Sequence, residues 1–95
     1  MDPRIWGRDL WNSLYNIAYV YPGNENEYIT NQYRTFFELL KDVIPCRMCR
    51  LNFKEHIAQT PISGYLKTNK DLVKWLNIIQ NDVCKLKGKK QISFE

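Results

Sequence analysis

Apolar residues recur along the first part of the chain with the three- and four-residue spacing of an amphipathic helix. Asp2 offers a side-chain acceptor and Pro3 a preset φ, a combination typical of a helix start. The repeat stops at Pro22 and Gly23, so the sequence predicts a first helix over this stretch. The expected core positions are Trp6, Leu10, Leu14, Ile17, Ala18 and Tyr21.

A second and a third helix are predicted from the same spacing, with a proline between them. The second helix follows the polar residues 24–27 and ends at Pro45. The third is shorter, running from Cys46 to about Ala58 with Cys46 in its first turn. The expected core positions of the second helix are Ile29, Tyr33, Phe36, Phe37, Leu40, Val43 and Ile44.

A fourth helix is predicted after residues 59–69, whose proline and glycine indicate a loop. Asn69 is expected to cap this helix, and Gly88 to follow its end. No stretch alternates with period two over enough residues to form a strand. The sequence therefore predicts an all-α fold, a compact four-helix bundle with a short tail, with residues 1–95 as a single domain. The expected core positions of the fourth helix are Leu72, Trp75, Leu76, Ile79, Val83 and Leu86.

The composition is that of a globular chain with a small core. With 44% hydrophobic and 25% charged residues, it fits neither a disordered nor a low-complexity class, and it has no apolar run of the length a membrane span needs. The first residues lack the apolar stretch of a secretory signal. A net charge of +4 suits an anionic ligand but does not by itself indicate nucleic acid. A core of this size often needs a metal, a disulfide, a cofactor or a partner.

A Cys-x-x-Cys pair, Cys46 and Cys49, is the sharpest local motif. Backbone N–H groups at a helix start stabilise a thiolate, and Arg47 and Arg50 add positive charge nearby. The spacing lets both sulfurs meet within one turn, so the pair can close a reactive disulfide. An odd total of three cysteines argues against a secreted disulfide scaffold. The motif indicates redox chemistry or metal binding.

Two other interpretations of these cysteines stay open. A zinc site would need Cys46, Cys49, His56 and Cys84, at intervals of six and then twenty-seven residues that are unlike the compact pairs of structural zinc sites. His56 is expected instead to be an exposed or capping residue. The second alternative is a small helical binding module whose thiols are not catalytic. A thioredoxin-like domain is excluded, because its motif follows a strand.

Amide side chains form a second stripe on the predicted fourth helix, opposite its core positions. The stripe is either a solvated face or the place where a polar ligand lies. Lysines cluster at its far end, where a pyrophosphate would suit them, but without the interleaved aromatic residues of a nucleic-acid surface. The stripe comprises Asn77, Gln80, Asn81, Cys84 and Lys87, and the cluster Lys85, Lys87, Lys89 and Lys90.

In combination, these motifs resemble the Erv/ALR family of FAD-dependent sulfhydryl oxidases, especially its short viral members of poxvirus type. Residues 7–15 look like the family's Gly-Arg-x-x-Trp-x-x-Leu-His, and a similar Tyr-Pro follows at residues 21–22. Residues 45–49 look like its Pro-Cys-x-x-Cys redox centre, and residues 75–84 like its Trp-Leu-Cys-x-x-His-Asn-x-Val-Asn. The resemblance spans roughly residues 4–90, with the three motifs in order.

The resemblance implies a thiol oxidase that forms disulfides in client proteins and passes the electrons through FAD to O2, giving H2O2. The client would attack Cys46, and Cys49 would lie against the flavin. No metal is implied. The residues implied to bind FAD are Gly7, Arg8, Trp11, Tyr15 and Tyr19 in the first helix and Gln80, Asn81, Val83, Cys84, Lys87 and Lys89 in or after the fourth.

The implied partners are a dithiol protein, of a thioredoxin- or glutaredoxin-like viral type, and a second copy of the chain. Tyr28, Tyr33 and Phe37 are expected to leave more aromatic surface than one bundle covers, which favours a homodimer through the first two helices. No nucleic acid is expected as a partner. The expected location of such a viral protein is the host-cell cytoplasm, with association with the virion as an alternative.

The chain departs from the family pattern at four positions. Tyr15 and Gln80 stand where the family has histidines, Cys84 where it has an asparagine, and Asn77 where cellular members have a structural cysteine. Tyrosine can still stack on a ring and donate a hydrogen bond, and glutamine keeps both donors and acceptors. Cys84 is expected to be a reduced, largely buried thiol beside the cofactor.

Overall fold

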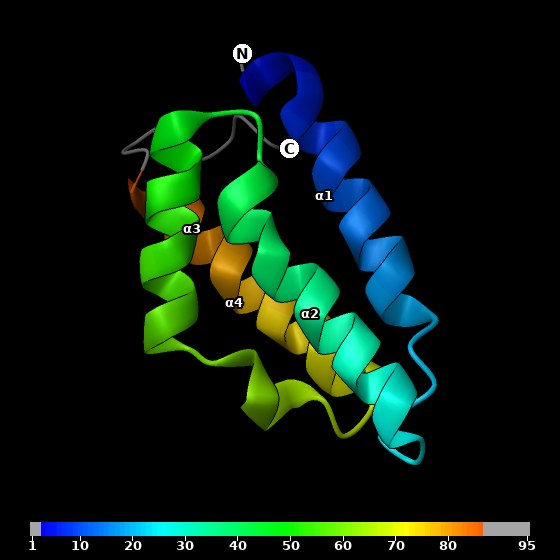
Figure 1. Cartoon of the computed structure of the whole chain (residues 1–95). Coiled ribbons are helices and arrows are strands. Elements are labelled where there is room, and N and C mark those ends of the chain that lie inside the picture. The colour runs from blue at the N-terminus through cyan, green and yellow to red at the C-terminus, as the bar shows by residue number, and fades with distance from the viewer. Residues whose placement is uncertain (1–2, 87–95) are drawn as a thin grey trace.

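The computed structural model describes residues 3–86, and the side chains of residues 6–81. Figure 1 shows the order of its elements, which are α1 (Pro3–Tyr19), α2 (Glu27–Val43), α3 (Arg47–Gln59), a short 3₁₀ helix η1 (Ile62–Tyr65) and α4 (Asn69–Leu86). The described part of the chain contains no strand, and the predicted all-α fold is confirmed. Within it, no helix combines the length and the hydropathy that crossing a bilayer requires.

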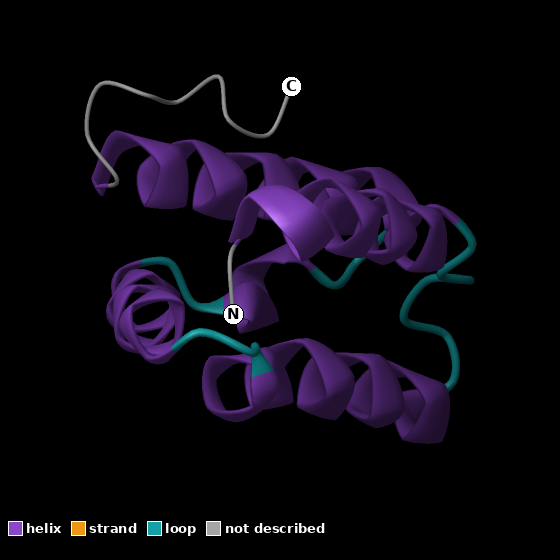
Figure 2. Cartoon of the chain, turned by 90° about the horizontal axis from the view of Figure 1, so that it is seen from above, coloured by secondary structure: helices purple, strands orange, loops and turns teal. Residues whose placement is uncertain are grey.

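The helices form a bundle in which α2 packs against α3, and α4 packs against both α1 and α3. Figure 2 shows α3 end-on, with α2 on one side of the bundle and α4 on the other. Three fully buried aromatic side chains meet at the centre. The ring of Trp75 lies edge-on to Phe37 at 6.0 Å and to Phe53 at 6.5 Å between centroids. These aromatic contacts join α2, α3 and α4 around one core.

Of the two adjacent phenylalanines expected in the core of the second helix, only Phe37 is buried, where it packs against Trp75. The expectation that Phe37 also adds exposed aromatic surface is wrong. Phe36 is 39% exposed and Val43 is 63% exposed, although both were expected in the core. Successive helical residues lie about 100° apart around the axis, so Phe36 and Phe37 cannot both face Trp75.

Polar contacts fasten the end of the bundle that holds the α1–α2 loop and η1. The Tyr21 hydroxyl donates to the Leu66 carbonyl at 2.6 Å and shares a hydrogen bond with the Thr30 hydroxyl at 3.1 Å. The Trp75 indole nitrogen donates to the Thr60 carbonyl at 2.8 Å. The two contacts of Tyr21 are buried, so they satisfy polar atoms whose removal from water would otherwise cost free energy. We call these contacts the loop-end latch.

The fourth helix is capped by Thr68, and the prediction of Asn69 as the cap is wrong. The Thr68 hydroxyl accepts from the Asp71 N–H at 3.2 Å, as an N-cap side chain does. The Asn69 amide instead donates to the Tyr19 carbonyl at 2.9 Å, where it satisfies an acceptor at the end of α1. The predicted caps Asp2 and Gly88 lie outside the described residues.

Candidate active site

A short loop, residues 44–46, carries the first cysteine between α2 and α3. Ile44 has φ −61° and ψ 132°, the extended conformation expected before a proline. Its carbonyl accepts from the Cys46 N–H at 2.7 Å and from Arg50 Nη1 at 2.7 Å. The guanidinium of Arg50 therefore holds the loop in place as well as contributing charge. The sequence gives no signal for this contact, which was not predicted.

Cys46 is the N-cap of α3, and so lies one position before the first turn in which it was expected. Its backbone is extended, and its Sγ accepts from the Cys49 N–H at 3.2 Å. An N–H aimed at sulfur favours the thiolate over the thiol. Cys46 is partly exposed, whereas Cys49 is only 6% exposed and packs in the core. The pair thus combines one partly exposed cysteine with one buried cysteine.

The two positions where the chain departs from the family's histidines are in direct contact. The Tyr15 hydroxyl donates to Gln80 Oε1 at 2.8 Å, joining α1 to α4. Both side chains are partly buried. Next to Gln80 on α4, the Asn81 amide donates to Asn77 Oδ1 at 3.2 Å on the exposed side of the helix. Sequence analysis predicted each residue separately and did not predict the contact between Tyr15 and Gln80.

The other predicted cofactor residues are spread along α1 and the far end of α4. Gly7 is buried and Arg8 exposed near the start of α1, while Trp11 is 6% exposed and forms part of the core. Tyr19 is 70% exposed at the opposite end of α1. The structure does not describe the side chains of Val83, Cys84 and Lys85. Three further lysines lie wholly outside the described residues, namely Lys87, Lys89 and Lys90.

A model of the Erv1 / Alr family matches residues 8–95 of the sequence. The chain belongs to the Erv1 / Alr family. The resemblance inferred from the three motifs is therefore confirmed.

Two curated members of the Erv1 / Alr family are similar to this chain. A probable FAD-linked sulfhydryl oxidase of Acanthamoeba polyphaga mimivirus is 35% identical over 95 residues, covering 99% of this chain and 66% of the relative. The mitochondrial FAD-linked sulfhydryl oxidase ERV1 of Saccharomyces cerevisiae is 23% identical over 84 residues, covering 88% of this chain and 43% of the relative. The chain thus spans just under two thirds of the viral relative's length and less than half of the yeast one's.

The Erv1 / Alr fold is also found by comparison of structures. The crystal structure of the yeast Erv1 core has a TM-score of 0.82, with 22% sequence identity, over 94% of this chain and 74% of that chain. At this identity the likeness concerns the fold. It agrees with the four-helix bundle predicted from the hydrophobic spacing.

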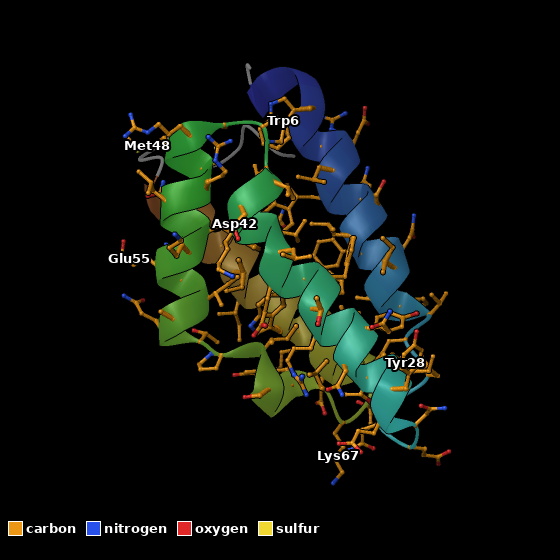
Figure 3. All side chains as sticks on the ribbon, viewed as in Figure 1. Trp6, Tyr28, Asp42, Met48, Glu55 and Lys67 are labelled. Carbon is orange, nitrogen blue, oxygen red and sulfur yellow. The ribbon has the colours of Figure 1, made fainter. Side chains whose placement is uncertain are left out.

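One buried donor in this Erv1 / Alr domain was not predicted as a site residue. The indole nitrogen of Trp6 is inaccessible to solvent and has no hydrogen-bond partner within the described structure. Trp6 lies at the beginning of α1, directly before Gly7 (Figure 3). An unsatisfied buried N–H costs about 1–3 kcal/mol, so its position calls for an acceptor. Sequence analysis had placed Trp6 only in the core stripe.

His56 differs from its prediction as an exposed or capping side chain. It is only 8% exposed, because it lies one turn after Phe53 on the face of α3 that also carries Cys49. Among the described residues, no three His, Cys, Asp or Glu side chains come together in a way that could hold a metal ion. The zinc alternative also needs Cys84, whose side chain lies outside the described residues.

Proposed function

We propose that this Erv1 / Alr domain is a FAD-dependent thiol oxidase that converts client dithiols to disulfides and O2 to H2O2. The observation that carries the proposal is the cysteine pair at the start of α3, with Cys46 partly exposed at the N-cap and Cys49 buried behind it. The names of the viral and yeast relatives, both FAD-linked sulfhydryl oxidases, support the same class of reaction.

The difference in exposure between Cys46 and Cys49 supports separate roles for their sulfurs. A client thiolate attacks Cys46 of the Cys46–Cys49 disulfide, forming a mixed disulfide and releasing the Cys49 thiolate. The second client thiolate then attacks the client sulfur of that bond, which closes the client disulfide and releases Cys46. The client has lost two electrons to the cysteine pair and two protons to solvent. The N–H of Cys49 stabilises Cys46 as the leaving thiolate.

The described residues fit a flavin. The orphaned Trp6 N–H supplies a buried donor, Trp11 and Tyr15 supply aromatic surface, and the Tyr15–Gln80 bond holds α1 against α4. Bound FAD would accept the two electrons from the cysteine pair and pass them to O2. The chain's own contribution is to place Cys49 on the core side of the pair and to keep water from it.

The remaining residues of the proposed FAD site are those inferred from the resemblance. Gly7, Arg8 and Tyr19 on α1 would bind along one side, and Asn81 on α4 along the other. Val83 and Cys84, with the lysines Lys87 and Lys89, complete the proposed set. We place the whole domain, residues 1–95, in this one function.

Single cysteine substitutions test the proposal. The wild-type protein is expected to be purified yellow, with the absorption band of a flavin, and to release H2O2 when it oxidises dithiothreitol. Cys46→Ser and Cys49→Ser should both abolish turnover, because either change removes one sulfur of the pair, and both should keep the flavin. Cys49→Ser should in addition hold an oxidised client on Cys46, because the Cys46 thiolate attacks the client disulfide, releases one client thiolate and has no Cys49 to resolve the mixed disulfide, which non-reducing mass spectrometry detects.

Cys84→Ser is the matched control, since it removes the cysteine outside the motif. It should keep most of the turnover and the flavin, and alkylation of the unreduced, denatured wild-type protein should label Cys84 alone. A colourless protein that retains stoichiometric zinc would contradict the oxidase and support the zinc alternative. Labelling of Cys46 or Cys49, or a dimer linked through Cys84, would show that the roles of the cysteines are wrong.

We infer a homodimer through α1 and α2 as part of the same proposal. A hollow of about 190 Å³ between these helices is lined by Ile17, Gln32, Tyr33 and Phe36, and Leu39 beyond it is 49% exposed. Phe36→Asp should therefore convert a dimer to a monomer in light scattering, whereas Leu51→Asp, at an exposed position on α3, should not. A wild-type monomer at tens of micromolar would contradict the inference.

The client and the location complete the proposal. The client we infer is a thioredoxin- or glutaredoxin-like protein of the same virus, acting in the host-cell cytoplasm or in the virion. Expression of the Cys49→Ser protein in infected cells, with identification of the protein disulfide-bonded to it, tests the client. Fractionation of the same cells tests the location. A trapped client without a thioredoxin-type fold, or recovery of the protein in a secretory compartment, would contradict this part.

A further inference from the structure

A positively charged hollow borders the loop that carries Cys46. It has a volume of about 200 Å³ and lies between the end of α2 and the outer face of α3. We call its lining the basic surface. Its residues are Lys41, Asp42, Arg47, Arg50, Leu51 and Lys54.

The basic surface carries four cationic side chains and one carboxylate. Asp42 lies 3.9 Å from Lys41, so its charge is already matched within the surface. Within the described structure, neither Arg47 nor Lys54 lies within 4.0 Å of a carboxylate, and both are exposed. Figure 3 shows Asp42 between α2 and α3, whereas Glu55 lies on the other edge of α3. The surface therefore has an excess of positive charge open to solvent.

The basic surface lies next to Cys46, both in the sequence and through a backbone hydrogen bond. Arg47 directly follows Cys46, and the Arg50 N–H donates to the Cys46 carbonyl at 2.9 Å. Lys54 lies one turn beyond Arg50 on the same face of α3. A chain bound across these residues would therefore lie next to Cys46, which is partly exposed.

We propose that the basic surface docks an acidic segment of the client next to the client's dithiol. The proposal rests on the thiol-oxidase function. A shallow hollow with charged walls and one half-exposed leucine, Leu51, suits an extended polypeptide better than a small molecule, which needs a deeper apolar pocket. Opposite charge on the client raises the rate of encounter and aligns the dithiol with Cys46.

Two dithiol peptides with the same Cys-x-x-Cys centre test the proposal, one flanked by Asp and Glu and the other by Asn and Gln. We expect kcat/KM for H2O2 release to be about fivefold higher for the acidic peptide at low salt, and the preference to disappear at high salt. Lys54→Glu should reduce the preference about threefold or more, since it reverses a charge two turns away from Cys46. Lys70→Glu, an equal charge change in the first turn of α4, is the matched control and should leave the preference intact.

A binding measurement separates this proposal from the oxidase itself. The fluorescent acidic peptide with serines in place of its cysteines should bind the wild-type and Lys70→Glu proteins in anisotropy titrations, and bind Lys54→Glu at least threefold more weakly. Equal binding of acidic and neutral peptides, or equal loss in both variants, overturns the docking surface. Failure to oxidise dithiothreitol overturns the oxidase and is read independently of the titration.

Discussion

At the scale of single residues, the two side chains that stand where the motif resemblance places family histidines bind each other. Tyr15 and Gln80 are 65 positions apart, yet their side chains meet at 2.8 Å between α1 and α4. A change at either position removes this hydrogen bond from the other side chain. The two departures from the family pattern are therefore one structural feature, which the alignment of motifs alone treats as two.

Tyr15→Phe is predicted to weaken both the fold and the binding of flavin. The change removes only the hydroxyl, so it should cost about 1 kcal/mol of unfolding free energy and leave Gln80 Oε1 unsatisfied. Urea denaturation measures the first effect, and titration with FAD, followed by flavin fluorescence, measures the second.

Tyr28→Phe is the control for this prediction, because Tyr28 is 68% exposed on α2, outside the proposed FAD site. A double-mutant cycle with Gln80→Leu should give a coupling energy of about 0.5–1 kcal/mol. Full additivity of the two changes would show that the hydrogen bond does not contribute.

The sequence predicted the cysteine pair but not what surrounds it. A Cys-x-x-Cys motif after a proline is recognisable because its members are close in the chain. The contact of Arg50 with the Ile44 carbonyl and the unsatisfied Trp6 N–H depend on how the chain folds in space. Burial of His56 was missed for the same reason, because a lone histidine in a short polar helix gives no periodic signal.

At the scale of helices, hydrophobic spacing predicted where each element lies better than how it is rotated. All four helices were predicted within a few residues of their ends, since prolines and the apolar repeat mark these positions. The rotation of α2 about its axis was not predicted, because Phe36 and Phe37 are equally apolar neighbours. Only the position of Trp75 determines that Phe37 faces the core. The predicted N-cap of α4, Asn69, lies one residue after the observed cap, Thr68, because threonine and asparagine are both good caps.

Thr68→Ala is predicted to lower the unfolding free energy by about 1 kcal/mol, because the Asp71 N–H at the start of α4 loses its acceptor. Thermal denaturation followed by circular dichroism measures the loss. Thr68→Ser keeps the hydroxyl and should restore most of the stability. Equal stability of the alanine and serine variants would contradict Thr68 as the cap.

At the scale of the whole molecule, the loop-end latch and the proposed site lie at opposite ends of the bundle. The loop-end latch fastens the end that holds η1 and the α1–α2 loop. The beginning of α1, the cysteine loop and the last turns of α4 lie at the opposite end (Figure 1). A ligand that contacts both α1 and α4 there would add to the Tyr15–Gln80 hydrogen bond, which already joins these two helices.

FAD is therefore predicted to raise the stability of the domain substantially. A ligand that binds only the native state adds about 4 kcal/mol at a thousandfold excess over its Kd. Differential scanning calorimetry of flavin-free and reconstituted protein should show a clear rise in Tm that grows with FAD concentration. Riboflavin, which lacks the pyrophosphate and adenosine, should raise Tm less. Equal Tm values with and without FAD would contradict this prediction.

The Ile44 carbonyl accepts two hydrogen bonds, and these restrict how the backbone of Cys46 can move during turnover. Cys46 must exchange one sulfur partner for another in each cycle of the proposed reaction, first Cys49 and then the client. Its backbone is fixed by its own N–H on the Ile44 carbonyl, and the loop by the Arg50 guanidinium on the same oxygen. Rotation about the Cα–Cβ bond of Cys46 is then the motion that moves the sulfur between partners, and side-chain rotations of exposed residues take picoseconds to nanoseconds.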